Sequence, residues 1–130
     1  MRALKLVRRR LDQAHASFSR AFAGRWRIAE MDQWEDIDLL GAAHITFVGK
    51  DSGELVFAAV EADLDVRYGS RDGAACAEFT WEGSDDNTHA SGRGWAALGT
   101  AGRLVGHLFI HKGDDSRFVA ERDSFNSLLD

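Results

Sequence analysis

Hydrophobic and polar residues alternate with a period of two along most of the chain after Gly24. The clearest case is residues 75–83, where one face of an extended chain carries Ala77, Phe79 and Trp81 and the other carries Glu78, Thr80 and Glu82. This alternation is typical of an antiparallel strand that is buried on one side only. The pattern predicts eight strands, at residues 26–31, 44–48, 54–60, 63–68, 75–83, 91–98, 103–111 and 117–122.

Turn-forming residues separate these segments. The chain contains no proline, so the turns depend on Gly, Asp, Asn and Ser, and Asp72-Gly73 is typical of a tight hairpin. Short strands at this spacing predict an all-β fold built from hairpins, with a helix at its N-terminus. Closing the sheet removes both of its edges, so we predict an eight-stranded antiparallel barrel. A two-sheet sandwich is the alternative, because periodicity does not separate the two.

Two segments have a different period. Between Leu4 and Phe22 the apolar residues are spaced alternately by three and four, which places them on one stripe of a helix that ends before Gly24. Residues 32–41 begin with the Asp-x-x-Glu pattern of a capping box and end in a glycine. We predict that this segment is a short helix that plugs one end of the strands.

Charge divides the chain into an arm and a body. Residues 1–23 carry six Lys and Arg against Asp12, a net charge of +5, and the whole chain has −5, which leaves about −10 for the remainder. We therefore predict a basic helical arm at 1–23, a barrel domain at 24–123 and a C-terminal tail at 124–130. An acidic body repels phosphate backbones, so we expect no nucleic acid on it. Four alternatives remain open for the arm: docking on the barrel, pairing of arms in a homo-oligomer, contact with a membrane surface or nucleic acid, and disorder.

The segment Gly24-Arg25-Trp26 opens the first predicted strand directly after the helical arm. It resembles the Gly-x-Trp start of the calycin group, which comprises lipocalins, fatty-acid-binding proteins and avidins. The resemblance implies that Trp26 packs across the floor of a barrel, against a basic residue of the last strand such as Arg117 or Arg122. It also implies a barrel that binds a small ligand.

The remaining composition bears on location. No stretch approaches the roughly 18 apolar residues of a membrane-spanning helix, so we expect no transmembrane segment, and an arginine run at 8–10 stands where a signal peptide would be apolar. Cys76 is the single cysteine, which excludes an internal disulfide and fits a reducing compartment. Segments such as 78–83 and 90–95 are similar to those of small uncharacterised bacterial proteins. We therefore expect a bacterial, cytoplasmic protein.

Aromatic residues on the predicted inner faces suggest a ligand site. Trp26, Trp81 and Trp95 fall on faces that we assign to the interior, where such rings either line a pocket or fill a core. In residues 91–95 two glycines indicate a bulge or a bend, and Arg93, in phase with Trp95, would point into the barrel mouth or lie solvated at its rim. We predict that a small hydrophobic or anionic ligand binds at a barrel end without catalysis. The candidate residues are Trp34, Tyr68, Arg93, Trp95 and His107.

Two other functions remain open. The first is a non-catalytic interaction or oligomerisation module that uses the basic arm. The second is an enzyme in which His107 or His111 acts as a base beside Arg93, although the sequence shows no nucleophile with an assembled base. The two histidines would lie about 13 Å apart on one strand face and cannot share a metal ion, so we expect neither a metal nor a cofactor.

Overall fold

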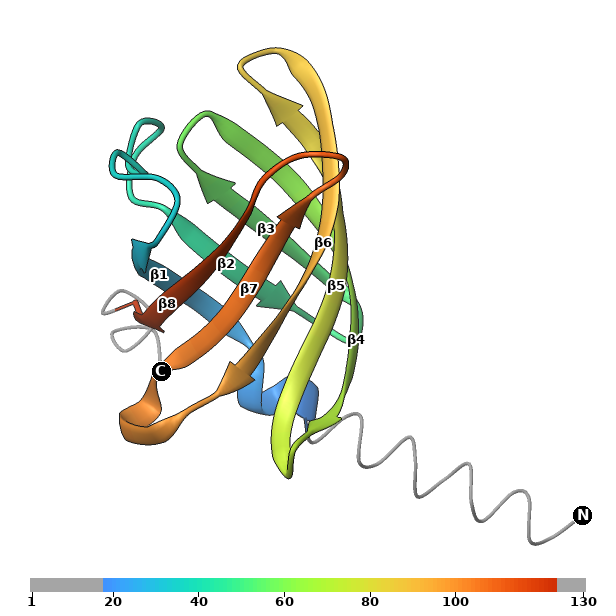
Figure 1. Ribbon diagram of the computed structural model, residues 1–130. Helices are drawn as coiled ribbons and strands as arrows, with labels where there is room; N and C mark the ends of the chain where they lie inside the picture. The colour runs from blue at the N-terminus through green and yellow to red at the C-terminus, as the bar shows by residue number, and fades with distance from the viewer. Residues whose placement is uncertain (1–17, 124–130) are drawn as a thin grey trace, which may run out of the picture.

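A closed barrel of eight antiparallel strands forms the body of the protein in a computed structural model, which describes residues 18–123 (Figure 1). Each strand pairs with the next along the chain, and β8 pairs with β1 to close the barrel. The predicted barrel is therefore confirmed and the sandwich is excluded. The strands are β1 (Gly24–Met31), β2 (His44–Val48), β3 (Ser52–Phe57), β4 (Val60–Arg71), β5 (Ala74–Asp85), β6 (Thr88–Leu98), β7 (Leu104–Ile110) and β8 (Asp115–Arg122), and a short 3-10 helix, η1 (Thr100–Gly102), precedes β7.

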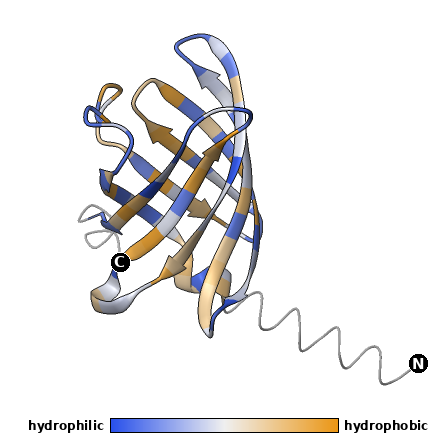
Figure 2. Ribbon diagram, viewed as in Figure 1, coloured by the Kyte–Doolittle hydropathy of each residue, from blue (hydrophilic) through white to orange (hydrophobic). Residues whose placement is uncertain are grey.

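The observed strands follow the predicted ones because alternation decides which side chains are buried. In β4, every second side chain from Val60 to Tyr68 is buried and those between them are exposed. Figure 2 shows the same alternation of hydrophobic and hydrophilic residues along the strands. The predicted strand at 54–60 is wrong in one respect, because the chain turns at Ala58, whose φ is +48°. Alanine is not a turn-forming residue, so the sequence carried no signal for this hairpin.

One barrel end is closed by a short helix at residues 18–22. Phe22 at the end of this helix is fully buried, and its ring centroid lies 5.5 Å from those of Phe47 and Tyr68. Gly24 follows with a φ of +107°, a backbone conformation that favours glycine. The end of the predicted arm therefore docks on the barrel, while the rest of the arm and the predicted C-terminal tail lie outside the described residues.

Trp26 lies at the same end and is 2% exposed. Its Nε1 donates a hydrogen bond to the backbone oxygen of Phe22 at 2.8 Å. The guanidinium of Arg122 lies 4.2 Å from the centroid of the Trp26 ring and donates to the backbone oxygens of Ala21 and Ala23. The predicted packing of Trp26 against a basic residue of the last strand is confirmed, and Arg122 is that residue.

The opposite barrel end is covered by an irregular segment, and the predicted helix over 32–41 is wrong. The carboxylate of Asp32 does not cap a helix, because it accepts a hydrogen bond from the hydroxyl of Ser116 on β8 at 2.6 Å. Ile37 is buried. The segment therefore covers the barrel end, as predicted, but through contacts with β8 and the core.

Glycines on the inner faces of β6 and β7 make room for aromatic rings. A Cβ added at any of three of them would lie 2.6–2.7 Å from a ring atom, closer than real contacts allow. The pairs are Gly92 with Trp81, Gly94 with Phe79, and Gly106 with Phe118. The rings therefore fill the barrel interior along β6 and β7, and the side chains between these glycines face outward.

Candidate functional site

The predicted ligand-site residues do not lie together at one end of the barrel. Because Gly92, Gly94 and Ala96 occupy the inner positions of β6, the side chains of Arg93 and Trp95 lie on the outer face. The assignment of Trp95 to the interior is therefore wrong, and of the two alternatives for Arg93 the one that points it into the barrel mouth is excluded. The physical reason is that a large ring from the neighbouring strand can fill the space beside a small inner residue. The small residues of β6 are therefore inside and the large ones outside, the reverse of what hydropathy predicts.

Two other candidates belong to the core. Trp34, in the covering segment, packs on Phe57 with ring centroids 5.2 Å apart. Tyr68 is 7% exposed near the other end, and its hydroxyl has no hydrogen-bond partner among residues 18–123. Burial, with a smaller contribution from Asp51, raises the pKa of Tyr68 to about 12. Neither residue lines a groove together with Arg93 and Trp95, and Tyr68 faces the interior whereas those two side chains face outward.

Arg93 and Trp95 help to form a groove of about 380 Å³ on the outer face of β4 to β7. The guanidinium of Arg71 lies 4.4 Å from the centroid of the Trp95 ring. In the same way, the guanidinium of Arg93 lies 4.3 Å from the centroid of Phe109, which is its direct neighbour on β7. The groove thus contains two cation–π pairs, one between β4 and β6 and one between β6 and β7.

The charges of this groove are unevenly neutralised. Arg67 pairs with Asp65, with Nη1 and Oδ1 2.5 Å apart, and Glu78 is the other carboxylate in the lining. The guanidinium groups of Arg71 and Arg93 form no hydrogen bond or ion pair with any residue that the structure describes, so their N–H groups stay available beside the rings. Three arginines face two carboxylates, which gives the groove a local excess of positive charge on an acidic body.

His107 lies beside this groove and directly opposite Trp95 on the neighbouring strand. Its Nε2 lies 2.5 Å from a carboxylate oxygen of Asp115, and its ring centroid lies 4.6 Å from that of Phe109. The imidazole therefore supports one wall of the aromatic cluster from the outer face. We define the outer-face cluster as Arg71, Arg93, Trp95, His107 and Phe109.

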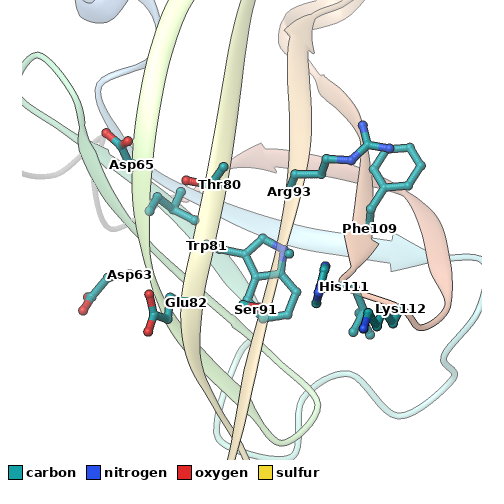
Figure 3. A pocket seen from close by; sticks show the side chains of 13 residues that line it. Asp63, Asp65, Thr80, Trp81, Glu82, Ser91, Arg93, Phe109, His111 and Lys112 are labelled. Carbon is teal, nitrogen blue, oxygen red and sulfur yellow. The ribbon is translucent and has the colours of Figure 1, made fainter.

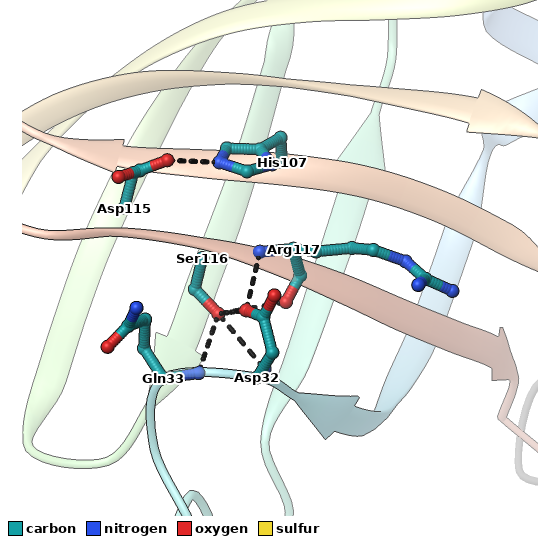
Figure 4. A network of polar contacts seen from close by, with 6 residues as sticks. All are labelled: Asp32, Gln33, His107, Asp115, Ser116 and Arg117. Carbon is teal, nitrogen blue, oxygen red and sulfur yellow. Dashed lines mark hydrogen bonds and ion pairs between the residues drawn. The ribbon is translucent and has the colours of Figure 1, made fainter.

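A separate polar network joins the covering segment to β8 (Figure 4). The carboxylate of Asp32 accepts hydrogen bonds from the Ser116 hydroxyl at 2.6 Å and from the backbone N–H of Arg117 at 2.9 Å. The Ser116 oxygen in turn accepts from the backbone N–H groups of Asp32 and Gln33, both at 3.2 Å. Chiefly through the Ser116 hydroxyl, this network lowers the pKa of Asp32. Its role is to hold the covering segment in place.

Arg71 and Phe109 are the site residues that sequence reasoning missed. Arg71 lies beyond the predicted strand at 63–68 and directly before Asp72-Gly73, a pattern that indicates a turn, but it ends β4 and its guanidinium stacks on Trp95. Phe109 belongs to the same outer face as His107. The signal that could have found Phe109 is strand register, because once Trp95 is placed outward its neighbours on β7 face outward too.

Residues 18–123 contain neither a group of potential metal ligands nor a helix that could span a membrane. Within them, no three His, Cys, Asp or Glu side chains are grouped so that they could hold a metal ion. No helix of this part has the length and apolar character to cross a bilayer.

Comparisons of the chain with protein-family models, with curated proteins and with solved structures found no match. Function is therefore inferred from the side-chain geometry.

Proposed function

We propose that this protein is a non-catalytic, calycin-like binding barrel whose ligand carries an anionic group and binds at the outer-face cluster. The observation that carries this function is the pair of guanidinium groups, on Arg71 and Arg93, that are stacked on aromatic rings without an anionic partner among the described residues. A cytoplasmic location remains a prediction from the sequence.

The chemistry of guanidinium groups favours an oxyanion as the ligand. A guanidinium that stacks on a ring keeps its N–H edge free, and this edge matches the two oxygens of a carboxylate or a phosphate. Stacking on Trp95 and Phe109 also restricts the two side chains, so less conformational entropy is lost when a ligand binds. The groove is therefore organised for an anion before any ligand arrives.

Packing favours the outer face over the interior. The rings of Phe79, Trp81 and Phe118 occupy the space above the inner glycines. A ligand inside this part of the barrel would have to displace them, whereas the outer groove offers about 380 Å³ of open space. The calycin-like assignment itself rests on the closed eight-stranded barrel and on the stacking of Arg122 on Trp26.

Binding without catalysis agrees with the surroundings of His107. Its side chain contacts Asp115 and Phe109, and neither residue carries a nucleophile that a general base could activate. The alternative of an interaction module that uses the basic arm stays a prediction, because most of that arm lies outside residues 18–123.

Titration with simple anions tests the proposed function. Sodium acetate and inorganic phosphate would be added to the full chain at constant ionic strength, and tryptophan emission would be recorded. We expect a saturable change that Trp95→Phe removes, and a comparison of the two anions distinguishes a carboxylate ligand from a phosphate ligand. Arg93→Gln and Arg71→Gln should each weaken binding at least about tenfold, because a hydrogen bond to a charged group contributes about 1.5–3 kcal/mol.

Arg27→Gln is the matched control, since Arg27 is an exposed arginine of β1 that lies outside the groove. It should leave the affinity unchanged. The proposed function is overturned if neither anion gives a saturable change, or if Arg27→Gln weakens binding as much as Arg93→Gln does.

A further inference from the structure

A second groove, of about 750 Å³, adjoins the first on the same outer face (Figure 3). Arg93 and Phe109 line both grooves, so any ligand of the second groove can also use the anion-binding guanidinium. The inference drawn from this groove therefore rests on the proposed function.

The second groove has one acidic side and one basic side. Asp63, Asp65 and Glu82 stand on β4 and β5, whereas Arg93 on β6 and Lys112 after β7 stand on the other side. Figure 3 shows the two sets of side chains on either side of Trp81. The lining is thus bipolar. A ligand with two like charges would be repelled either by the acidic side or by the basic side.

Register gives the separation of the two charges. Glu82 pairs with Ser91 on β6, and the backbone oxygen of Ser91 accepts a hydrogen bond from His111, the residue before Lys112, so two inter-strand steps separate Glu82 from the basic end at Lys112. At about 4.8 Å a step, the backbones that carry opposite charges lie about 10 Å apart.

Several polar groups in this groove have no partner among the described residues. The side chains of Asp63 and Lys112 form no hydrogen bond or ion pair there, while the side chain of Asp65 is paired with Arg67 and that of Glu82 with His89. The lining also includes Trp81, which is 2% exposed and whose Nε1 donates to no acceptor within residues 18–123. Because this atom is buried in the filled interior, it is not open to a ligand in the outer groove, and the exposed charged side chains are the groups that a ligand can reach.

We infer that the second groove binds an extended peptide segment whose cationic side chain faces Asp63 and Glu82 and whose carboxylate faces Arg93 and Lys112. In a polyproline II chain, which has three residues per turn, the first and fourth side chains lie on the same side and their Cα atoms are about 9 Å apart, which matches the separation of the two sides. Adjacent opposite charges are too close together to reach both sides.

Blocked tetrapeptides test this inference. Acetylated and amidated Lys-Ala-Ala-Glu and Ala-Lys-Glu-Ala have the same composition and the same net charge, and differ only in charge spacing. Binding to the full chain would be measured from amide chemical shifts in nuclear magnetic resonance spectra. We expect Lys-Ala-Ala-Glu to bind at least about tenfold more tightly, as two additional charge-assisted contacts would give.

Variants locate the acidic side of the site. Asp63→Asn combined with Glu82→Gln should remove the preference for Lys-Ala-Ala-Glu while leaving the binding of acetate or phosphate intact. Glu30→Gln, at an exposed carboxylate of β1, is the control and should change neither. Circular dichroism would check that each variant folds.

The outcomes separate this inference from the proposed function. Failure of acetate and phosphate to bind overturns both. If either anion binds, but the two peptides bind equally, or neither binds, or the double variant keeps the preference, the peptide inference alone is overturned.

Discussion

Gly92 faces the barrel interior on β6, where a side chain would meet fixed neighbours. A Cβ there would lie 1.9 Å from the backbone oxygen of Phe109 and 2.7 Å from the Trp81 ring. Because neither neighbour is the free end of a flexible side chain, we expect Gly92→Ala to lower the free energy of unfolding by about 1–3 kcal/mol. Urea denaturation followed by tryptophan emission measures this.

Gly69 on β4 provides the matched control for this substitution. A Cβ at Gly69 would meet no atom within 4 Å, and its φ is not in the left-handed region. Gly69→Ala should therefore be neutral or stabilising by up to about 1 kcal/mol, since alanine restricts the unfolded chain. Equal losses for both variants would contradict the assignment of Gly92 to the filled interior.

Cys76 is also affected by its surroundings. It lies on the outer-face register of β5 but is only 2% exposed, and burial raises the pKa of its thiol. A raised pKa keeps the thiol protonated and unreactive at neutral pH. We expect an aromatic disulfide reagent to modify Cys76 slowly at pH 8 in the folded protein and rapidly in denaturing urea. Rapid modification of the folded protein would show that the thiol is accessible.

At the scale of one residue, hydropathy predicted most burial correctly and failed at Trp95. Trp26 and Trp81 are buried as predicted, because both face the interior from strands that carry large residues at inner positions. Trp95 stands between Gly94 and Ala96, which are small but buried. The ring that covers Gly94 is that of Phe79 on β5, and a single strand carries no information about its neighbour's side chains.

Among the elements, the covering segment depends on the network of Asp32 and Ser116. Ser116 is fully buried, and Ser116→Ala would leave the Asp32 carboxylate and two backbone N–H groups without this partner. We expect a loss of about 1–3 kcal/mol in the free energy of unfolding. Hydrogen exchange at the N–H groups of Asp32 and Gln33 should become faster. Unchanged exchange would contradict the role of this network.

The same network predicts a pH dependence. The pKa of Asp32 is lower in the folded protein than its ordinary value of 3.8, so ionised Asp32 stabilises the fold. This contribution is complete above the ordinary pKa and is lost as the pH falls through the lowered value. The stability difference between the protein and Asp32→Asn should therefore be constant near neutral pH and shrink in strong acid. Denaturation at a series of pH values measures it.

Glu35→Gln is the control for this experiment. Glu35 is an exposed carboxylate of the same segment for which no hydrogen bond to a described residue is found. This variant should have the stability of the unchanged protein throughout the series. A difference of equal size for both variants would show that general charge, rather than the contact with Ser116, causes the effect.

At this scale the strands were predictable, because alternation of hydrophobic and polar residues reflects contacts within a sheet. The covering segment was not predictable. The Asp-x-x-Glu pattern at 32–35 is a local signal for a helix. It was overridden because Asp32 binds Ser116, a residue of the last strand that is distant in the sequence. A capping box cannot reveal such a competing partner.

At the scale of the whole molecule, Arg122 links the last strand to the first strand and the short helix. Arg122→Gln would remove its stacking on Trp26 and the hydrogen bonds to Ala21 and Ala23. We expect the free energy of unfolding to fall by about 2 kcal/mol. Arg117→Gln, at an exposed side chain of the same strand, should change it little. Urea denaturation of both variants gives the comparison, and equal losses would refute the linking role.

The barrel as a whole was predictable, and the position of its candidate site was not. Eight alternating segments joined by short turns suffice to predict a hairpin-built sheet, and closure follows from the cost of free edges. The outer groove depends on which side chains of β4, β5, β6 and β7 become neighbours. That arrangement follows from register, which the sequence determines only through all the strands together.

Closure of this barrel depends on one pairing of a different kind from the rest. All other strand pairs join consecutive segments, whereas β1 meets β8 only after nearly the whole body has been brought around. The loop that this pairing closes is long, so its entropic cost is the largest and its formation is the slowest expected step in folding. A circular permutant that joins residues 18 and 123 by a linker and opens the chain between Asp86 and Asn87 would transfer this late step to β5 and β6 while keeping the short helix and every strand pair of the native barrel.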